Sequence, residues 1–331
     1  MTDGGAGAFA FLLDAMTSIR AILYDAAGHD EEVSAADIDL TSLRKDQLLW
    51  IDGSLAEVKA LKRLPAEIAD AVSEEVRPVS LEIFEPFYRF WVPALPERKG
   101  RSVKPIHFVV GKGWLLTISE PRPPFMESFV ERDRGETLNG RLTPSGLAVA
   151  LMEELLDSYR SELSGIDQSI DALDDLILTS LESRTPLETL AKLRRKVAAL
   201  RAALDQTGST VHALLRPDFF AHIAETDHAH FEALGRTHER LEDSVSRARE
   251  TVIGSFDLYT TRMAQDTNRL VKALTVATVI IGVVSAAAGI FGMNFDTPFA
   301  HSGVAGFVEV VVAMVACALA IVGVAIWRRW F

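Results

Sequence analysis

The sequence has little of what cofactor and metal enzymes rely on. Its 331 residues include a single cysteine, Cys317, which excludes a disulfide framework and a thiolate metal site. Lys and Arg number 34 against 46 Asp and Glu, and this net charge of −12 argues against nucleic acid as a partner. No glycine-rich phosphate loop, Ser/His/Asp arrangement or close His/Asp cluster occurs in the region of mixed pattern at about residues 18–119. The sequence therefore predicts that the protein is not an enzyme.

Two long apolar runs, residues 273–291 and 304–327, lie close to the C-terminus. The first contains no charged residue, and its polar side chains are Thr275, Thr278 and Ser285. As a helix it would be about 28 Å long, close to the ~30 Å hydrocarbon core of a bilayer. The second run contains one carboxylate, Glu309, near its start. Both runs are predicted transmembrane helices that follow a large soluble region.

Basic residues flank the two runs on one side only. Arg262, Arg269 and Lys272 precede the first run, and residues 328–331 form a basic tail after the second, whereas residues 292–303 between the runs contain no Lys or Arg. Positive charge marks the cytoplasmic side, so both chain ends are expected in the cytoplasm, with the loop outside a cytoplasmic (inner) membrane. The apolar patch at residues 8–16 lacks a preceding basic segment, so we expect no signal peptide.

Residues 1–143 have the mixed pattern of a small α/β domain. Strands are expected at residues 19–24, 48–51, 79–84, 88–92, 106–110 and 115–119, and helices at 54–64 and 65–73. Residues 144–216 then predict a helical hairpin, whose first helix has one apolar face. Its other face is acidic and is most simply explained as a solvated surface, and the second helix is basic at residues 192–196.

The segment from residue 217 predicts one very long helix. After Pro217 only Gly235 and Gly254 interrupt helical periodicity before the first apolar run, so residues 217–272 form a stalk that continues into the membrane. Roughly 70 helical residues would measure about 105 Å. His228 and His230 are two positions apart and diverge on a helix, so no zinc site is expected there.

The first apolar run ends in Phe291-Gly292-Met293-Asn294-Phe295. With the two C-terminal runs, the long preceding helix and the acidic hairpin, this segment resembles the CorA family of divalent-cation channels and transporters. Residues 268–275, Trp50-Ile51-Asp52 and Val76-Arg77-Pro78-Val79 also resemble landmarks of that family. The resemblance implies an α+β cytoplasmic domain, a long helical stalk and two transmembrane helices. These would assemble as a funnel-shaped homopentamer in membrane lipid.

The resemblance also implies roles for particular residues. Gly292, Met293 and Asn294 would form a selectivity filter, in which neutral oxygens hydrogen-bond a hydrated ion without trapping it. The pore would be lined by Asn268, Val271, Leu274, Gly282 and Ser285. Asp296 and Glu309 would lie at the external mouth, and Asp70 and Glu232 are candidates for a regulatory Mg²⁺.

Three functions remain open on the sequence. The first is uptake of Mg²⁺, with Co²⁺ or Ni²⁺ also possible cargo. The second is zinc transport of the related ZntB type, with coupling to protons as a variant of it. Met293 favours the first, whereas His301 and the absence of a carboxylate at Ala233 favour the second. The third is a membrane-anchored protein without transport, in which Gly292 and Asn294 form an ordinary helix C-cap.

Overall fold

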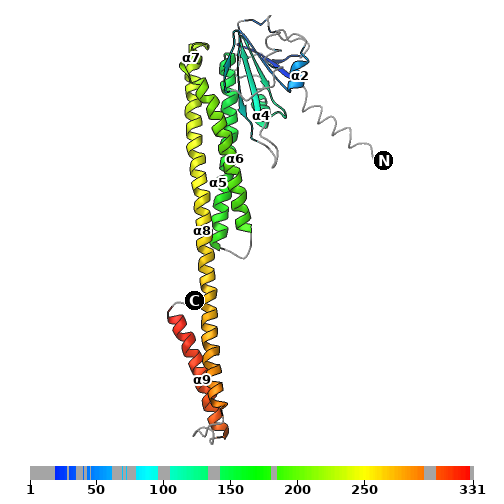
Figure 1. Ribbon diagram of the computed structural model, residues 1–331. Coiled ribbons are helices and arrows are strands. Elements are labelled where there is room, and N and C mark those ends of the chain that lie inside the picture. Colours follow the sequence, from blue (N-terminus) through cyan, green and yellow to red (C-terminus); the bar gives the residue numbers. More distant parts are fainter. Residues whose placement is uncertain are drawn as a thin grey trace, which may run out of the picture. The chain divides into compact units, whose positions relative to one another are not determined.

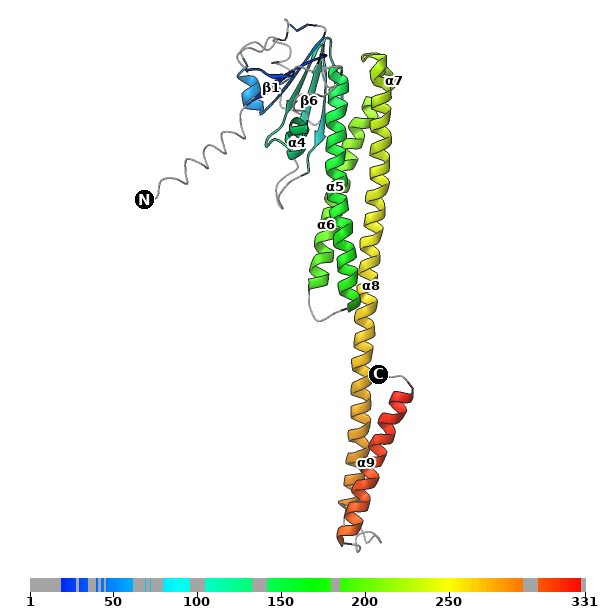
Figure 2. The same ribbon diagram turned by 180° about the vertical axis from the view of Figure 1, so that it is seen from behind.

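The computed structural model describes residues 19–27, 30–34, 40, 43–44, 46–61, 69, 72, 80–95, 105–132, 142–179, 185–293 and 303–328. The chain forms two compact units (Figures 1 and 2). Unit 1 consists of Met1–Asp171 and Thr189–Val252, and unit 2 of Ala172–Glu188 and Ile253–Phe331. Unit 1 contains a sheet with its helices, and unit 2 contains both apolar runs.

The sheet of unit 1 has the order β2-β1-β3-β7-β6-β5-β4. Its strands are β1 (Arg20–Asp25), β2 (Glu31–Glu32), β3 (Gln47–Gly53), β4 (Glu82–Ile83), β5 (Tyr88–Pro93), β6 (Pro105–Gly111) and β7 (Trp114–Ile118). Among the described strands, only β3 and β7 pair in parallel. β3 and β7 are buried almost throughout, as expected of central strands covered on both faces. The α/β prediction with a mixed sheet is confirmed.

Two predicted elements are shorter than the sequence suggested. The helix expected at residues 54–64 is α2 (Leu55–Lys59), which begins with a capping box between Ser54 and Glu57. It ends because the Ala60 N–H bonds back to the carbonyls of Glu57 and Val58. The strand expected at residues 79–84 is reduced to β4, because the chain turns at Phe84, whose N–H donates to the carbonyl of Phe87 at 2.8 Å. Most of the helix expected at 65–73 lies outside the described residues.

Strand β5 attaches the sheet to the helices of unit 1. The hydroxyl of Tyr159, on α5 (Pro144–Thr179), donates to the carbonyl of Pro93. The hydroxyl of Thr210, on α6 (Thr185–Leu214), donates to the carbonyl of Trp91 at 2.8 Å. Buried Tyr88 donates to Ser145 at 2.9 Å. These bonds satisfy polar groups that would otherwise be buried without partners, so they fix the sheet on the helices.

Helix α5 has the apolar face that its periodicity predicted. Thr143 caps it by accepting the N–H of Gly146 at 2.9 Å, with Pro144 as the first helical residue. The apolar stripe is fully or almost fully buried and consists of Leu151, Leu155, Tyr159, Leu163, Ile166, Ile170 and Leu173. On the opposite face, Glu162 pairs with Lys196 of α6 at 2.8 Å, as the complementary charges of the hairpin predicted.

A buried polar cluster fixes α4 (Pro124–Arg132) and its entry loop against the sheet of unit 1. The carboxylate of Asp52, 3% exposed, accepts from Arg122 at 2.5 Å and from Thr117 at 2.6 Å. Thr117 in turn accepts from the indole N–H of Trp50 at 3.0 Å. Burial raises the pKa of Asp52, while Arg122 and Thr117 act against that shift. Such a buried pair is stable only while both partners are present.

The remaining helices are α7 (Pro217–Phe220), α8 (Glu225–Phe291) and α9 (Gly303–Trp327). The expected stalk is α8, a single helix of 67 residues that includes the first apolar run. α9 contains the second run. Both contain windows long and apolar enough to cross a membrane, and within the described residues only 6% of each window is buried. A soluble core helix of this composition would be mostly buried, so these helices require another apolar environment.

Candidate ion pathway

Within the first apolar run, helix α8 carries its polar side chains on one face, and this face continues toward the N-terminus of the helix. With ~100° per residue, the following residues project within about 120° of one another: Asp257, Asn268, Val271, Leu274, Thr275, Thr278, Gly282 and Ser285. Every one of them is exposed. All the polar side chains of the first apolar run lie in this set, which we call the polar stripe. In an otherwise apolar helix, such segregation indicates a face that does not contact lipid.

The opposite face of α8 packs against α9. Val276 is 7% exposed, and Ala273, Ile280, Val284 and Ala287 on the same side are half-buried. In α9 a matching row is buried or half-buried and consists of Gly306, Val310, Met314, Ala318, Ile321, Val322 and Ala325. Both ribbon views show α9 running back alongside the last part of α8 (Figures 1 and 2). α9 therefore covers the apolar side of α8 and leaves the polar stripe open.

The hydroxyl groups of the polar stripe have a defined orientation. Thr275 donates its proton to the carbonyl of Val271 and Thr278 to that of Leu274, each at 2.8 Å. The proton of each hydroxyl is therefore directed at the backbone, and its lone pairs remain outward. Lone pairs accept hydrogen bonds from the waters around a cation, whose protons point outward. This arrangement suits a hydrated cation better than an anion.

The stripe also contains apolar positions next to its polar ones. Val271 is 54% exposed and Leu274 is 68% exposed, one helical turn apart. Copies of these residues around a pore would form a narrow apolar ring, where water is expelled easily. At Gly282 the space beside the helix is open, with no atom within 4 Å of the place that a side-chain carbon would occupy. The pore would be wide at that level.

Helix α8 ends at the sequence-predicted filter. The N–H of Gly292 still bonds the carbonyl of Ala288 at 2.9 Å, and the N–H of Met293 bonds that of Ile290 at 3.3 Å. A side-chain carbon at position 292 would lie 3.1 Å from the carbonyl oxygen of Ala288, so glycine fits this tightened last turn. Gly292 and Met293 are exposed, and Asn294 lies outside the described residues.

The other predicted site residues are only partly described. Glu309 is exposed in the second turn of α9, whereas Asp296 lies outside the described residues. Glu232 is exposed and pairs with Arg236 on its own helix at 3.7 Å, and Asp70 is also outside the described part. No group of three His, Cys, Asp or Glu that could hold a metal ion occurs among the residues described. The regulatory Mg²⁺ site therefore stays a prediction.

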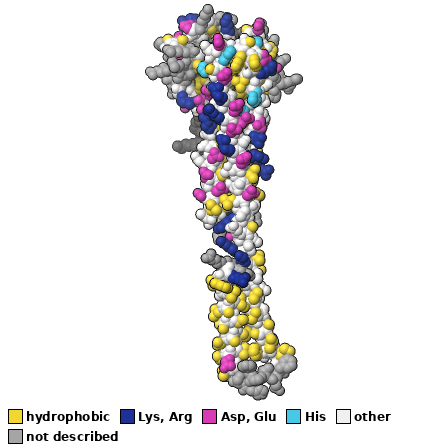
Figure 3. Space-filling view, turned by 90° about the vertical axis from the view of Figure 1, so that its left-hand side faces the viewer, with side chains coloured by type: hydrophobic (Ala, Val, Ile, Leu, Met, Phe, Trp, Pro, Cys, Tyr) yellow, Lys and Arg dark blue, Asp and Glu magenta, His cyan; other side chains and the backbone are white. Residues whose placement is uncertain are grey.

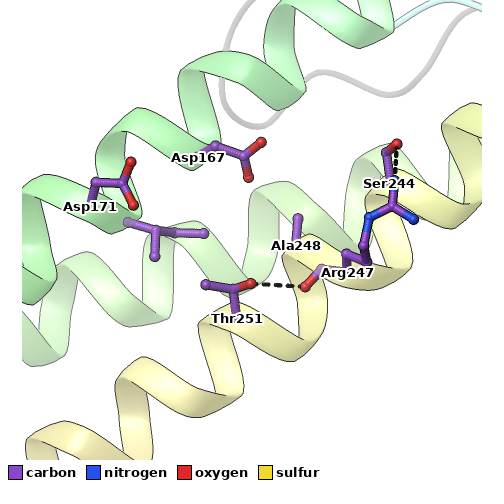
Figure 4. A pocket seen from close by; sticks show the side chains of 7 residues that line it. Asp167, Asp171, Ser244, Arg247, Ala248 and Thr251 are labelled. Atoms are coloured by element: carbon purple, nitrogen blue, oxygen red, sulfur yellow. Dashed lines mark hydrogen bonds between the residues drawn. The ribbon is translucent and has the colours of Figure 1, made fainter.

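A cavity of about 330 Å³ lies in unit 1 between α5 and α8 (Figure 4). Asp167 and Asp171 project into it from α5, and Arg247 lines it from α8. Burial raises the pKa of Asp167, and the neighbouring charge of Asp171 raises it further. Arg247 donates to Ser244 at 2.7 Å, so its guanidinium is turned along its own helix. A cation in this cavity would meet that guanidinium, which disfavours a metal site.

Sequence reasoning alone missed three members of the polar stripe. Thr275 and Thr278 stand out in the sequence only as polar residues of the first run, and Asp257 lies before that run. Counting helical phase forward and backward from Asn268 would have placed all three on the same face. Among the described residues of the stripe, Asp257 is the only carboxylate, since Asp266 lies on the side of α8 that α9 covers further along.

Comparison with known proteins assigns the family. Residues 47–328 match the model of the CorA-like Mg²⁺ transporter protein family. The chain belongs to the CorA family. Its members are membrane transporters of divalent metal ions, so the two exposed apolar helices of unit 2 are explained. Family resemblance and fold class, as predicted from the sequence, are both confirmed.

Individual relatives support this assignment. The cobalt/magnesium transport protein CorA of Thermotoga maritima is 29% identical over 157 residues, which cover 45% of this chain. The match spans less than half of that relative, 42% of its length. The protein of the same name from Methanocaldococcus jannaschii is 23% identical over 280 residues, covering 82% of this chain and 87% of the relative.

Two solved structures share the fold. The complete CorA magnesium transporter of Methanocaldococcus jannaschii superposes with a TM-score of 0.70 at 22% identity, covering 96% of this chain and 100% of that one. The ZntB cytoplasmic domain of Vibrio parahaemolyticus superposes with a TM-score of 0.57 at 8% identity, covering 75% of this chain and 100% of the domain. The fold is therefore shared with a CorA magnesium transporter and with a ZntB cytoplasmic domain, and it does not by itself select the ion.

Proposed function

We propose that this CorA-family protein carries Mg²⁺, with Co²⁺ as a further cargo, into the cytoplasm through a pore lined by the polar stripe of α8. The observation that carries the proposal is the segregation of that stripe away from α9. Two helices cannot enclose a water-filled path through lipid, so several copies must share the pore. A homopentamer with α8 innermost and α9 outermost places every stripe on the axis.

The ion would pass with most of its waters retained. Mg²⁺ dehydrates reluctantly and is usually held through water. Rings of amide oxygen at Asn294 and Asn268, and of hydroxyl oxygen at Ser285, Thr278 and Thr275, accept hydrogen bonds from those waters. Asp257 adds a ring of carboxylates at the inner end, which raises the local cation concentration. The Val271 and Leu274 rings close the path by dewetting when neighbouring helices approach.

Zinc transport of the ZntB type is the second candidate. The fold of unit 1 is shared with a ZntB cytoplasmic domain, and Ala233 provides no carboxylate beside Glu232 for a regulatory Mg²⁺. Against zinc, the described part of the polar stripe contains no histidine or cysteine, which are the ligands that Zn²⁺ prefers. Met293 in the filter also favours the magnesium assignment.

Ion flux into proteoliposomes distinguishes these candidates. Mg²⁺, Co²⁺ and Zn²⁺ are supplied separately, with and without a proton gradient. We expect Mg²⁺ and Co²⁺ entry that does not depend on the gradient. Zinc entry that requires the gradient, without Mg²⁺ flux, would establish the second candidate. Absence of flux for every divalent ion would refute transport altogether.

Variants of Asn294 test the filter assignment separately. Asn294→Ala removes the amide oxygen and should reduce Mg²⁺ flux roughly tenfold or more, because loss of a ring of ion-facing acceptors leaves the hydrated ion unpaired. Asn294→Gln, which keeps the amide, is the matched control and should retain part of the flux. Both variants should elute as the wild-type oligomer. Unchanged flux in Asn294→Ala would remove the selectivity role.

A further inference from the structure

Basic side chains gather at one end of the apolar band of unit 2 (Figure 3). On α8 they are Arg262, Arg269 and Lys272, and directly after α9 the described basic residue is Arg328. Helix α9 has 25 residues, the same number as the segment 267–291 of α8. Because α9 runs back alongside α8, its C-terminal end comes level with the segment that contains Arg262 and Arg269.

Arg262 and Arg269 lie on the side of α8 that faces away from the polar stripe. By helical phase, Arg262 and Arg269 share the face of Val276, Ile280 and Ala287, which α9 covers further along. In an oligomer whose polar stripes line a pore, this face points outward to α9 and lipid. The cations therefore do not obstruct the pore, and they reach the level of the lipid headgroups.

Their charges are poorly compensated by the protein. The Nε of Arg262 is buried and has no hydrogen-bond partner within the described part of the chain. Lys272 and Arg328 form no ion pair with any residue that the structure describes. Arg269 contacts Asp266 at 3.5 Å, with the arginine side chain 65% exposed. A buried guanidinium N–H without an acceptor has a cost that an incoming anion would remove.

We propose that Arg262, Arg269, Lys272 and Arg328 bind the phosphate headgroup of an anionic phospholipid in the cytoplasmic leaflet. Guanidinium groups match phosphate oxygens with two parallel N–H donors, and clustered cations beside a membrane helix attract anionic lipids. Trp327, 81% exposed and next to Arg328, suits the same interface with its amphipathic ring. The proposal rests on the membrane placement given above and not on the identity of the transported ion.

Thermal unfolding of the full-length protein in neutral detergent tests the site. Short-chain dioctanoyl-phosphatidylglycerol, dioctanoyl-phosphatidylcholine and inorganic phosphate are titrated separately. We expect a rise in Tm with phosphatidylglycerol only, because a ligand that binds the folded state stabilises it. The rise should disappear at about 0.5 M NaCl, where exposed charges are screened. An equal rise with phosphatidylcholine would overturn the proposal, and an equal rise with inorganic phosphate would assign the site to free anions instead.

Arginine variants test whether phosphatidylglycerol binds at this cluster of basic residues. Arg262→Gln/Arg269→Gln/Arg328→Gln should weaken phosphatidylglycerol binding about fivefold per arginine removed. The matched control is Arg194→Gln/Arg240→Gln/Arg249→Gln, which removes three exposed arginines from unit 1 and should bind like the wild type. Should the first variant fail to fold, Arg262→Lys/Arg269→Lys/Arg328→Lys keeps the charge and should retain most of the binding.

The outcomes separate this proposal from the transport function. Equal phosphatidylglycerol binding by the glutamine variant and the wild type would refute the lipid site even if ion flux is observed. A protein that transports no divalent ion but binds phosphatidylglycerol through these arginines would refute the transport proposal alone.

Discussion

Individual residues matter most in this chain where charge is buried. The Asp52–Arg122 pair has side chains 4% and 14% exposed, whereas Lys196 and Glu162 remain 48% and 44% exposed. Removing one partner of a buried pair leaves an uncompensated charge, but exposed pairs contribute little because water screens them. These two ion pairs should therefore respond very differently to truncation.

Asp52→Ala should lower the stability of unit 1 by about 3–5 kcal/mol, because Arg122 would keep its charge in a buried position. Glu162→Ala, the exposed counterpart, should change it by less than ~1 kcal/mol. Urea unfolding of the full-length protein followed by tryptophan fluorescence compares them, since Trp50 lies in the same cluster. Equal midpoints for the two variants would contradict the structural role of the buried pair.

His107 should make unit 1 sensitive to acid. Burial, and to a smaller extent the charge of Arg89, lower its pKa from 6.5 to about 4. The unfolded chain then binds more protons between these values, so stability is fully present above pH 6.5 and decreases as the pH falls toward 4. The loss amounts to roughly 3 kcal/mol at most.

Midpoints of urea unfolding at a series of pH values measure this effect. The glutamine of the His107→Gln variant cannot titrate. This variant should therefore lack the part of the stability decrease between pH 6.5 and 4 that is due to His107. Parallel pH profiles for wild type and variant would show that another group is responsible. The carboxylates that titrate in the same range are common to both proteins and cancel in the comparison.

At the scale of the element, α8 combines two functions in one helix. Its outer face in unit 2 packs on α9, and its polar stripe remains uncovered. The same 3.6-residue period therefore determines which side chains contact protein, lipid or water. If the opposite face of α8 lined the pore instead, Val276 and Ile280 would face the ion, and the hydroxyls of Thr275 and Thr278 would lie against α9.

Cysteine labelling tests this orientation, because the chain has only one native cysteine. In a Cys317→Ser background, cysteines at Gly282 and Ser285 should react with a membrane-impermeant thiol reagent and block Mg²⁺ flux. Cysteines at Val283 and Ile290, which are exposed but lie off the stripe, should react far more slowly. Comparable labelling at Gly282 and its neighbour Val283 would rule out the proposed pore face.

At the scale of the whole molecule, one chain is an incomplete transporter. Exposed apolar residues cover both helices of unit 2, and a single pair of helices has no enclosed path for water. Each copy supplies one polar stripe, so function depends on assembly. The homopentamer is part of the proposed function, and the coupling between its copies can be measured through flux.

Co-expression of wild type with Asn294→Ala at equal levels measures this coupling. If five subunits share one filter, most assemblies contain at least one defective residue, and flux should fall well below half of the wild-type value. A protein that transports as independent monomers should retain half. Equal amounts of the two chains are verified by a small epitope tag on the variant.

The sequence alone determined the elements with strong periodicity. The apolar runs, the long α8 and the buried stripe of α5 were predictable because hydrophobic spacing reports the burial pattern directly. The short elements α2 and β4 were overestimated, because their ends depend on hydrogen bonds at Ala60 and Phe84 that periodicity does not encode. Of the candidate site, the stripe positions Asn268, Val271, Leu274, Gly282 and Ser285 followed from the family resemblance, whereas Asp257, Thr275 and Thr278 did not.

Tertiary structure decided what those positions face. Only the packing of α9 on the Val276 side distinguishes the polar stripe from the covered side, since phase along a helix is relative until a partner fixes it. The same packing brings Arg328 level with Arg262 and Arg269, although more than fifty residues separate them in the chain. Sequence therefore determined which residues form the two apolar helices, and the contact between those helices determined which face of α8 is covered and which stays open.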